Sequence, residues 1–191
     1  DTLYCNMYMA YEALPEATKR RLEGLQASHS YLASFEGKTK SGYARDTLTD
    51  EQKAQLSEVT HPVVRTHPET GRKALYVNEH FTRRIVEMSG EESDNFLGFL
   101  TRWVQSPRFT VRYHWTEGTI GMWDNRCTQH YVLNDFDAER IIQRVTVMGD
   151  KPEGPDPRWE PWTARAGRSA MSRHDRQLAR HLSERNREAA E

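Results

Sequence analysis

The stretch Trp123-Asp124-Asn125-Arg126-Cys127-Thr128-Gln129-His130, followed by Arg140 and Arg144, decides how this sequence is interpreted. His130 ends a short polar turn, where a neutral imidazole can be presented to a metal ion. Arg140 and Arg144 stand in a β-branched run and can each hold an anion through paired hydrogen bonds. One metal ligand with two anion clamps predicts a metal enzyme with an acidic cosubstrate and an acidic substrate. Because one histidine cannot hold a catalytic metal alone, the pattern also requires further ligands.

The spacing of the two arginines predicts two separate anions. In an extended strand Arg140 and Arg144 share one face and lie roughly 13 Å apart, at about 3.3 Å per residue. That distance is too long for one carboxylate. Asn134-Asp135 and Asp137 allow the chain to reverse, so His130 could lie on a neighbouring strand of the same sheet. The alternative is that the arginines lie on a solvated strand face and His130 is an ordinary polar residue, and spacing alone favours that alternative.

Composition indicates one soluble globular domain. The chain has 191 residues, of which 36% are hydrophobic and 29% charged, with a net charge of -1. This balance gives no reason to expect nucleic acid or an acidic membrane as a partner. No apolar run reaches membrane-spanning length and no secretory segment is present, so we expect no membrane association. Cys5 and Cys127 form no disulfide framework and fit a reducing cytoplasm.

Three helices are predicted within the first 104 residues. Pro15 to Leu25 has a proline in its first turn and apolar residues on one stripe. Thr49 to Val59 predicts a short polar helix. Ser89-Gly90-Glu91-Glu92 is a capping-box pattern ahead of an apolar run that ends at Val104, which makes this helix the strongest prediction. Between the first two, Phe35 to Arg45 is rich in Gly and Lys and predicts a loop.

Most of the remaining pattern predicts strands. A hairpin is expected around His67-Pro68-Glu69-Thr70-Gly71, and Glu117-Gly118 predicts a second turn. The predicted strands are Val63 to Thr66, Ala74 to Val77, Phe109 to Trp115, Thr119 to Trp123 and Arg140 to Val147. Strands late in the chain with helices inserted earlier predict a mainly β fold, a jelly-roll core with helical excursions.

The character of the sequence changes after Gly149. Lys151 to Trp162 is rich in Pro and Trp and predicts an extended segment. Ser172 to Ala190 is rich in Arg with few apolar anchors, which predicts a helical tail that packs on another subunit or stays solvated. We therefore divide the chain into a domain over residues 1–152 and a tail over 153–191, and expect a homo-oligomer.

Several blocks in order resemble the taurine dioxygenase family. The central signature is Trp123 to Arg126, Thr128-Gln129-His130-Tyr131, Arg140, Arg144-Val145-Thr146 and Gly149-Asp150-Lys151-Pro152. Similar family blocks are Asp1-Thr2-Leu3, Ala10 to Leu14, His61 to Pro68, Tyr76 to Glu79 and Phe81. The likeness covers residue 1 to about Pro152. It implies an iron(II)- and 2-oxoglutarate-dependent oxygenase with a double-stranded β-helix, or jelly-roll, core.

The resemblance implies a role for each matching residue. His130 would be the distal histidine of a two-histidine, one-carboxylate iron site. Arg140 would pair with the far carboxylate of 2-oxoglutarate, and Thr2 would donate its hydroxyl to the same carboxylate. Arg144 would bind the anionic head of the substrate.

Three aromatic residues match family positions near the reacting centre. Phe35 and Phe81 would line the substrate pocket, and Trp123 would lie near the metal. Plain core packing is the alternative for all three.

The remaining iron ligands of the family come from a His-x-Asp or His-x-Glu motif upstream of the position matching Thr2. Within the chain only His67-Pro68-Glu69 fits that spacing, and the resemblance places it on a hairpin after the ligand motif, so we do not assign it. His174-Asp175 lacks the spacer. We therefore expect the sequence to be the later part of a jelly roll, with the two other ligands upstream of Asp1.

The function implied is hydroxylation of a small sulfonate or sulfate ester, with O2 consumed and succinate and CO2 as co-products. Two alternatives are a fragment or pseudoenzyme that binds an anion without turnover, and an oxygenase of an aryloxy-carboxylate. A third gives the Arg-rich stretch Arg165 to Arg187 a nucleic-acid-binding role, which the interspersed acidic residues oppose.

Overall fold

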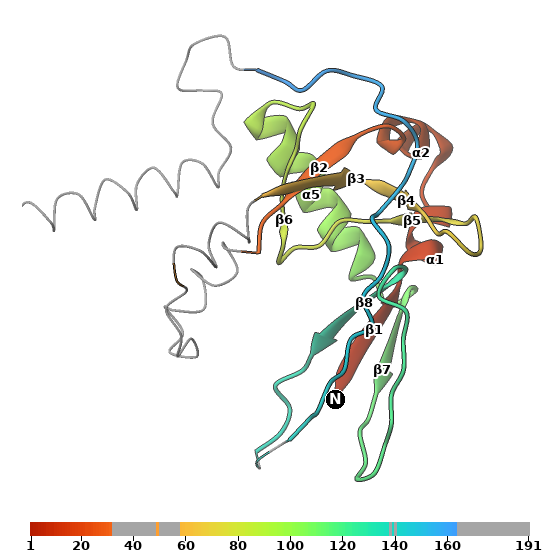
Figure 1. Cartoon of the computed structure of the whole chain (residues 1–191), viewed down its shortest axis with the longest axis vertical. Coiled ribbons are helices and arrows are strands. Elements are labelled where there is room, and N and C mark those ends of the chain that lie inside the picture. Colours follow the sequence, from red (N-terminus) through yellow and green to blue (C-terminus); the bar gives the residue numbers. More distant parts are fainter. Residues whose placement is uncertain (32–48, 50–57, 138, 140, 164–191) are drawn as a thin grey trace, which may run out of the picture.

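The computed structural model describes residues 1–31, 49, 58–137, 139 and 141–163. Its strands form two three-stranded sheets and one two-stranded ribbon, in the orders β7-β1-β8, β3-β2-β6 and β4-β5, all antiparallel (Figure 1). The strands are β1 (Thr2–Asn6), β2 (Gln26–His29), β3 (Val59–Pro62), β4 (Val64–Thr66), β5 (Lys73–Leu75), β6 (Thr82–Ile85), β7 (Thr110–Tyr113) and β8 (Thr128–Val132). The helices are α1 (Met7–Glu12), α2 (Glu16–Leu22) and α5 (Gly90–Val104). The sheet β7-β1-β8 extends from one end of the body, as Figure 1 shows.

A single cluster of buried apolar residues joins the helices to the second sheet and the ribbon. Ala10 of α1, Leu22 of α2, Ile85 of β6 and Leu100 of α5 have no exposed surface. The indole Nε1 of Trp103 donates to the carbonyl of Ala10 at 2.8 Å and so ties α5 to α1. Strand β1 of the protruding sheet continues directly into α1 and so joins that sheet to this cluster.

Helix α5 confirms the strongest helix prediction. The Ser89 hydroxyl accepts from the backbone N–H of Glu92 at 3.4 Å, as a capping residue does. Glu91 and Glu92 lie in the first turn, where negative charge is favourable. Leu97, Leu100 and Val104 are buried along one side, which is the stripe that a helix turned toward a core requires.

Helix α2 confirms the prediction over Pro15 to Leu25 but ends earlier, at Leu22. Gly24 has a φ of +83°, a conformation that ends a helix, and a Cβ there would lie 2.4 Å from Cγ of Arg158. The chain then enters β2.

The hairpin prediction is confirmed as well. Strands β4 and β5 pair with Val64 opposite Leu75 and Thr66 opposite Lys73. The backbone N–H of His67 donates to Arg72 across the turn, and Gly71 takes the positive φ of +67° that the reversal needs.

Two strand predictions are wrong. Residues 119–123 form no strand, and Ile120 and Met122 are 92% and 93% exposed. Residues 141–147 form no strand either, although Phe109 to Trp115 does contain β7. The physical reason is the same for both: within the described residues neither segment has a neighbouring strand to exchange backbone hydrogen bonds with.

Residues 150–163 run back across the body without forming a helix (Figure 1). Thr66 donates to the carbonyl of Glu153 at 2.8 Å, Arg158 to Gly24 at 3.2 Å and Trp162 to Val86 at 2.9 Å. We call residues 150–163 the strap. The extended conformation predicted for Lys151 to Trp162 is therefore found, stabilised by backbone hydrogen bonds to distant parts of the chain.

Some predictions fall on residues whose structure is not described. The loop from Phe35 to Arg45 and the helix from Ser172 to Ala190 lie outside the described residues, and so does most of the helix predicted over Thr49 to Val59. Its last residue, Val59, belongs to β3. Across the described ranges, no helix combines the length and hydrophobicity that crossing a membrane requires.

Candidate functional site

His130 and Thr2 come together on one face of the sheet β7-β1-β8. His130 of β8 lies directly opposite Tyr4 of β1, and Thr2 lies two residues before Tyr4. Directly opposite residues and residues two apart share a face in an antiparallel sheet, so Thr2, Tyr4 and His130 point to the same side. Residues more than 120 positions apart in the sequence therefore form one surface.

Aromatic rings surround His130 on that face. The Trp123 ring lies 5.0 Å from the His130 ring and 5.2 Å from the Tyr4 ring, measured between centroids. Desolvation lowers the pKa of His130 below its ordinary value, and the nearby positive charge of Arg144 lowers it further, although part of the side chain stays exposed. Both effects favour the neutral imidazole, which is the form that a metal ligand needs.

Thr2 has a partner that the sequence did not suggest. Its side chain is only 3% exposed, and its Oγ1 accepts a 2.8 Å hydrogen bond from the indole Nε1 of Trp115. Trp115 follows β7, two residues after Tyr113, which is itself opposite Thr2. The period-two alternation of Val111, Tyr113 and Trp115 was the available signal that Trp115 lies on the same face as Thr2.

The structure also describes Arg144 and Phe81. Arg144 is exposed and lies in a segment without regular structure. Phe81 is half-buried in the turn before β6 and stacks on Tyr31, with ring centroids 5.5 Å apart. In the described part of the chain no ring contact joins Phe81 to His130. Arg140 and Phe35 lie outside the described residues.

An ion-pair network locks the turn ahead of β8 onto the tip of the hairpin. The Asp124 carboxylate accepts from Nε and Nη2 of Arg126 at 3.0 and 2.8 Å. Arg126 also donates to Glu69 at 3.0 Å, and His67 Nε2 lies 3.1 Å from Asp124. The Arg126 guanidinium holds the pKa of the Asp124 carboxyl well below its usual range. The network fixes the point at which the chain enters the strand that carries His130.

His67, Asp124 and Cys127 each bring a potential metal-ligand atom within 4.8 Å of the others. The backbone N–H groups of Glu69 and Thr70 both donate to His67 Nδ1 at 3.3 Å. The imidazole proton must then be on Nε2, the atom that faces Asp124, and a protonated nitrogen cannot coordinate a metal. Because the Asp124 carboxylate is already paired with Arg126, this cluster is better explained as a structural ion pair. The geometry supports leaving His67-Pro68-Glu69 out of the iron site.

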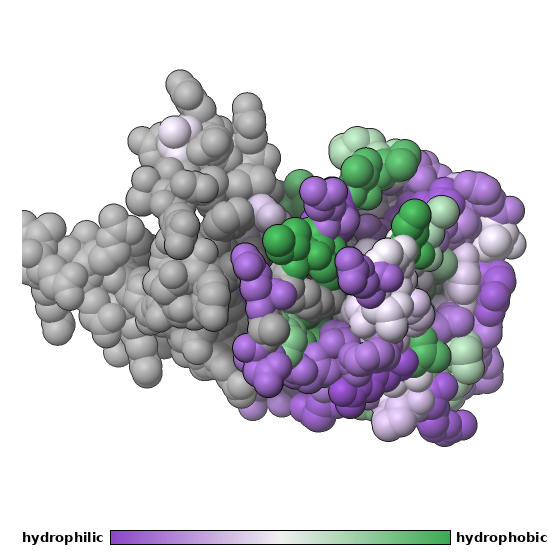
Figure 2. Space-filling view, turned by 90° about the horizontal axis from the view of Figure 1, so that it is seen from below, coloured by the Kyte–Doolittle hydropathy of each residue, from purple (hydrophilic) through white to green (hydrophobic). Residues whose placement is uncertain are grey.

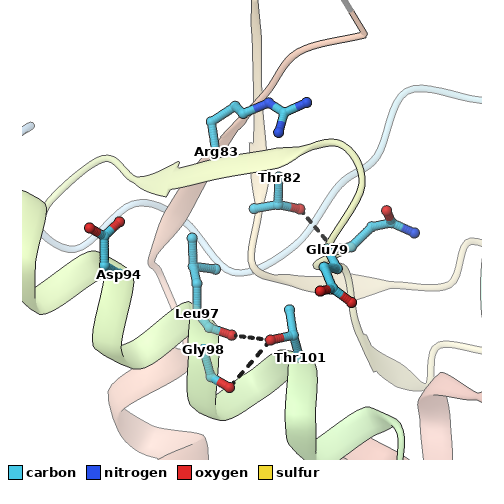
Figure 3. Close-up of a pocket in the computed structure, with 8 residues that line it drawn as sticks. Glu79, Thr82, Arg83, Asp94, Leu97, Gly98 and Thr101 are labelled. Atoms are coloured by element: carbon cyan, nitrogen blue, oxygen red, sulfur yellow. Dashed lines mark hydrogen bonds between the residues drawn. The ribbon is translucent and has the colours of Figure 1, made fainter. Parts of the chain in front are cut away.

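A polar hollow lies between β6 and α5 (Figure 3), and no residue of the sheet β7-β1-β8 lines it. Its lining residues are Asn78, Glu79, Thr82, Arg83, Asp94, Leu97, Gly98 and Thr101. Thr101 donates to the carbonyls of Leu97 and Gly98 at 2.9 and 3.3 Å, and Thr82 Oγ1 accepts from the backbone N–H of Asn78 at 2.7 Å. The hydroxyl groups of Thr82 and Thr101 are therefore both engaged with nearby backbone groups.

Apolar side chains surround the site face. Val111, Tyr113 and Val132 share the face with Thr2 and are 65%, 43% and 47% exposed. Figure 2, which looks at the molecule from the end where β1, β7 and β8 lie in Figure 1, shows hydrophobic residues lying between hydrophilic ones. Exposed apolar side chains thus lie on the same face as the histidine and the threonine.

The antiparallel sheets, with His130 and the buried Thr2 on one face of β7-β1-β8, fit the strands of a jelly roll. The chain belongs to the taurine catabolism dioxygenase TauD, TfdA family, whose sequence pattern matches residues 1–146. This confirms the family resemblance and, with the structural comparisons, the predicted fold class.

Curated relatives share substantial identity with the chain. It is 40% identical to an alkylsulfatase of Acinetobacter baylyi over 158 residues, covering 81% of this chain and 49% of the relative. It is 36% identical to an alpha-ketoglutarate-dependent sulfate ester dioxygenase of Pseudomonas putida over 160 residues, covering 82% of this chain and 52% of the relative. The chain therefore spans about half the length of these relatives.

Solved structures agree. A taurine dioxygenase from Burkholderia xenovorans matches with a TM-score of 0.54 and 32% identity, covering 68% of this chain and 40% of that one. AAD-2, solved with Mn(II) and N-oxalylglycine, also matches with a TM-score of 0.54 and 32% identity, covering 68% of this chain and 48% of that one.

Proposed function

We propose that the protein carrying this chain is an iron(II)- and 2-oxoglutarate-dependent dioxygenase that hydroxylates a small sulfate ester or sulfonate. Succinate and CO2 are the co-products. The observation that supports this most is the shared face of Thr2 and His130 beside Trp123, in a chain of this family. The alkylsulfatase and the sulfate ester dioxygenase among the relatives support the substrate class.

The iron fits one residue of this chain. His130 presents a neutral, partly exposed imidazole, the form that an iron ligand takes. Among the described residues no second ligand group is hydrogen-bonded or stacked against it, so a two-histidine, one-carboxylate site needs two ligands from elsewhere. Bound iron would supply the oxidation of a substrate C–H bond with O2.

Binding and orientation are the tasks of the other residues. Thr2 donates its hydroxyl to the far carboxylate of 2-oxoglutarate, and Arg140 pairs with the same carboxylate. Arg144 would hold the substrate anion and so orient one C–H bond for oxidation. Trp123 and Tyr4 cover part of the His130 ring. Hydroxylation of the carbon next to a sulfate oxygen or a sulfonate gives an unstable product, which collapses to an aldehyde and sulfate or sulfite.

The two arginine assignments are tested by separate substitutions in the full-length protein. Arg140→Ala should raise the KM for 2-oxoglutarate, and Arg144→Ala the KM for the substrate, each by about 10- to 100-fold because one charged hydrogen-bonding partner is lost. Steady-state kinetics with each ligand varied in turn measures both. If both variants raised the KM of one ligand and spared the other, the assignment of two clamps would be wrong.

A carboxylate substrate is the second candidate. The chain is 34% identical over 152 residues to an alpha-ketoglutarate-dependent 2,4-dichlorophenoxyacetate dioxygenase of Burkholderia sp., and an arginine at position 144 suits a carboxylate equally. A screen of succinate release with alkyl sulfates, alkylsulfonates, taurine and aryloxy-carboxylates separates the two classes. Release with none of these anions would favour the non-catalytic alternative.

We propose a homo-oligomer without nucleic-acid partners, located in the cytoplasm. The free thiols of Cys5 and Cys127 support a reducing compartment. We also propose a domain boundary between residues 152 and 153.

A further inference from the structure

The hydrogen bond between Trp115 and Thr2 fixes which way the Thr2 hydroxyl points. An indole N–H can only donate, whereas a threonine hydroxyl has one proton to give and two lone pairs to accept with. The 2.8 Å contact from Trp115 Nε1 therefore makes Thr2 Oγ1 the acceptor. The single proton of Thr2 cannot be used toward Trp115 and must be directed elsewhere.

The Thr2 hydroxyl is too buried for water to take that proton freely. Its side chain is 3% exposed, and within the described ranges no other polar group forms a hydrogen bond with Oγ1. A buried donor without an acceptor is costly, so the site favours a ligand that brings an acceptor. Because Thr2 shares its face with His130, that acceptor arrives on the side where the metal ligand lies.

The indole of Trp115 is itself held in place. A Cβ on Gly121 would lie 2.7 Å from Cη2 of Trp115 and 3.3 Å from Cζ3, so only glycine lets the ring lie there. Tyr113 packs edge-on against the same ring, with centroids 5.2 Å apart. The glycine and the tyrosine together restrict the indole to the position from which Nε1 reaches Thr2.

We propose that Trp115 is a positioning residue that makes Thr2 an obligatory hydrogen-bond donor to the far carboxylate of 2-oxoglutarate. Gly121 provides the space that the indole of Trp115 occupies. The proposal rests on the proposed function, because it takes 2-oxoglutarate as the ligand of Thr2. An acceptor-only anion is favoured at this position, and a ligand that presents a donor there is rejected.

The first test is Trp115→Phe in the full-length protein, which keeps a large aromatic ring and removes the N–H. The Kd for 2-oxoglutarate, measured by calorimetry without O2 and with Mn(II) as the metal, should rise about tenfold. Without the indole N–H, the Thr2 hydroxyl is free to turn its proton away from the carboxylate. The KM for 2-oxoglutarate should rise in parallel, while kcat at saturating 2-oxoglutarate stays within about twofold. Gly121→Ala should weaken binding in the same direction.

A double-mutant cycle separates this role from plain packing. In a Thr2→Val background the proton is gone, so Trp115→Phe should cause no further loss of 2-oxoglutarate affinity. Losses that multiply in the double variant would overturn the proposal. Trp103→Phe is the matched control, because it removes an indole hydrogen bond of the same 2.8 Å length in the core, and it should leave the Kd unchanged.

The outcomes distinguish this proposal from the function on which it rests. If the wild-type protein binds no 2-oxoglutarate, both are wrong. If the wild-type protein binds it and Thr2→Val weakens binding but Trp115→Phe does not, only the role of Trp115 is overturned. As a readout independent of any ligand, the indole N–H resonance of Trp115 should exchange with solvent more slowly in the wild-type protein than in Thr2→Val.

Discussion

Three histidines in this chain are held in three different environments, and each environment sets a different chemistry. His130 lies beside two aromatic rings with part of its side chain in solvent. His67 accepts two backbone hydrogen bonds on one nitrogen and contacts Asp124 with the other. His29 packs against His61 with ring centroids 5.3 Å apart, and its Nε2 is buried without a hydrogen-bond partner among the described residues. Only the first is suited to a metal.

Replacing His130 tests the metal assignment. His130→Ala in the full-length protein should abolish stoichiometric iron binding, because removing one of three protein ligands greatly lowers the affinity of the site for iron. Iron content of the purified variant, measured by atomic absorption after reconstitution, reports the result. His114→Ala is a suitable control, since that histidine lies in the same region with its side chain 80% exposed. Undiminished iron in His130→Ala would contradict the assignment.

His29 should make stability fall in mild acid. Burial, chiefly, lowers the pKa of His29 to about 4, against 6.5 for the free side chain. Between these values the unfolded chain binds a proton that the folded chain does not, so the free energy of unfolding decreases as the pH falls from 6.5 to 4. The loss is about 3 kcal/mol. Above pH 6.5 this histidine contributes no pH dependence.

Urea unfolding at pH 7.0, 5.5 and 4.5 measures that loss. His29→Gln carries no titrating group and should show a flatter profile than the wild-type protein over the same range. The remaining slope should come in part from His61, whose pKa is also lowered by burial. An equally steep profile in His29→Gln would show that His29 is not the source.

Elements whose causes are local could be predicted, and elements that depend on distant partners could not. Helix α5 was predicted because its cap at Ser89 and its apolar stripe lie within one short window. The hairpin β4–β5 was predicted from its turn residues. Strand β1 pairs with β7 and β8 more than 100 residues later, and no pattern in Thr2–Asn6 indicates that it pairs with those strands. The error at residues 141–147 has the same origin, because a β-branched run forms a strand only beside another strand.

The residues of the candidate site also fall into those that could be predicted from the sequence and those that could not. His130, Thr2 and Trp123 came from the family resemblance, and the structure gathers them on one face. Trp115 was missed because its partner, Thr2, lies 113 positions away. A hydrogen bond between two side chains so far apart cannot be recognised from the sequence around either of them.

The junction between α2 and the strap gives a test at the level of elements. Gly24 has a φ of +83°, and a Cβ there would lie 2.4 Å from Arg158 and 2.8 Å from the carbonyl of Asp156. Gly24→Ala should lower the free energy of unfolding by about 3 kcal/mol, because backbone strain and overpacking add.

Gly118→Ala is the matched control for Gly24→Ala. Gly118 has a similar φ of +75° with no atom within 4 Å of a Cβ, so it should cost only the backbone strain, about 1–2 kcal/mol. Urea unfolding of both variants measures the difference, which is the contribution of the strap contact. Equal losses in the two variants would mean that the strap does not pack closely on Gly24.

At the scale of the whole molecule, the compact body and the protruding sheet differ in how well they are covered. The body buries its apolar residues around α1 and α5. The sheet β7-β1-β8 carries His130 and Thr2 but leaves Val111 and Val132 about half exposed or more on the same face. In this chain the groups proposed to bind ligands thus lie on the less covered part, which the compact body anchors through β1.

The strap also has a consequence for synthesis of the protein on the ribosome. Its backbone hydrogen bonds join Arg158 to Gly24 and Trp162 to Val86, segments that leave the exit tunnel long before the strap does. At about 5–20 residues per second, the earlier segments wait several seconds or more for their last partner. During that interval Gly24 and Val86 present unpaired carbonyls at the surface of the nascent domain. Codon choice between residues 86 and 162 should therefore affect the yield of folded protein.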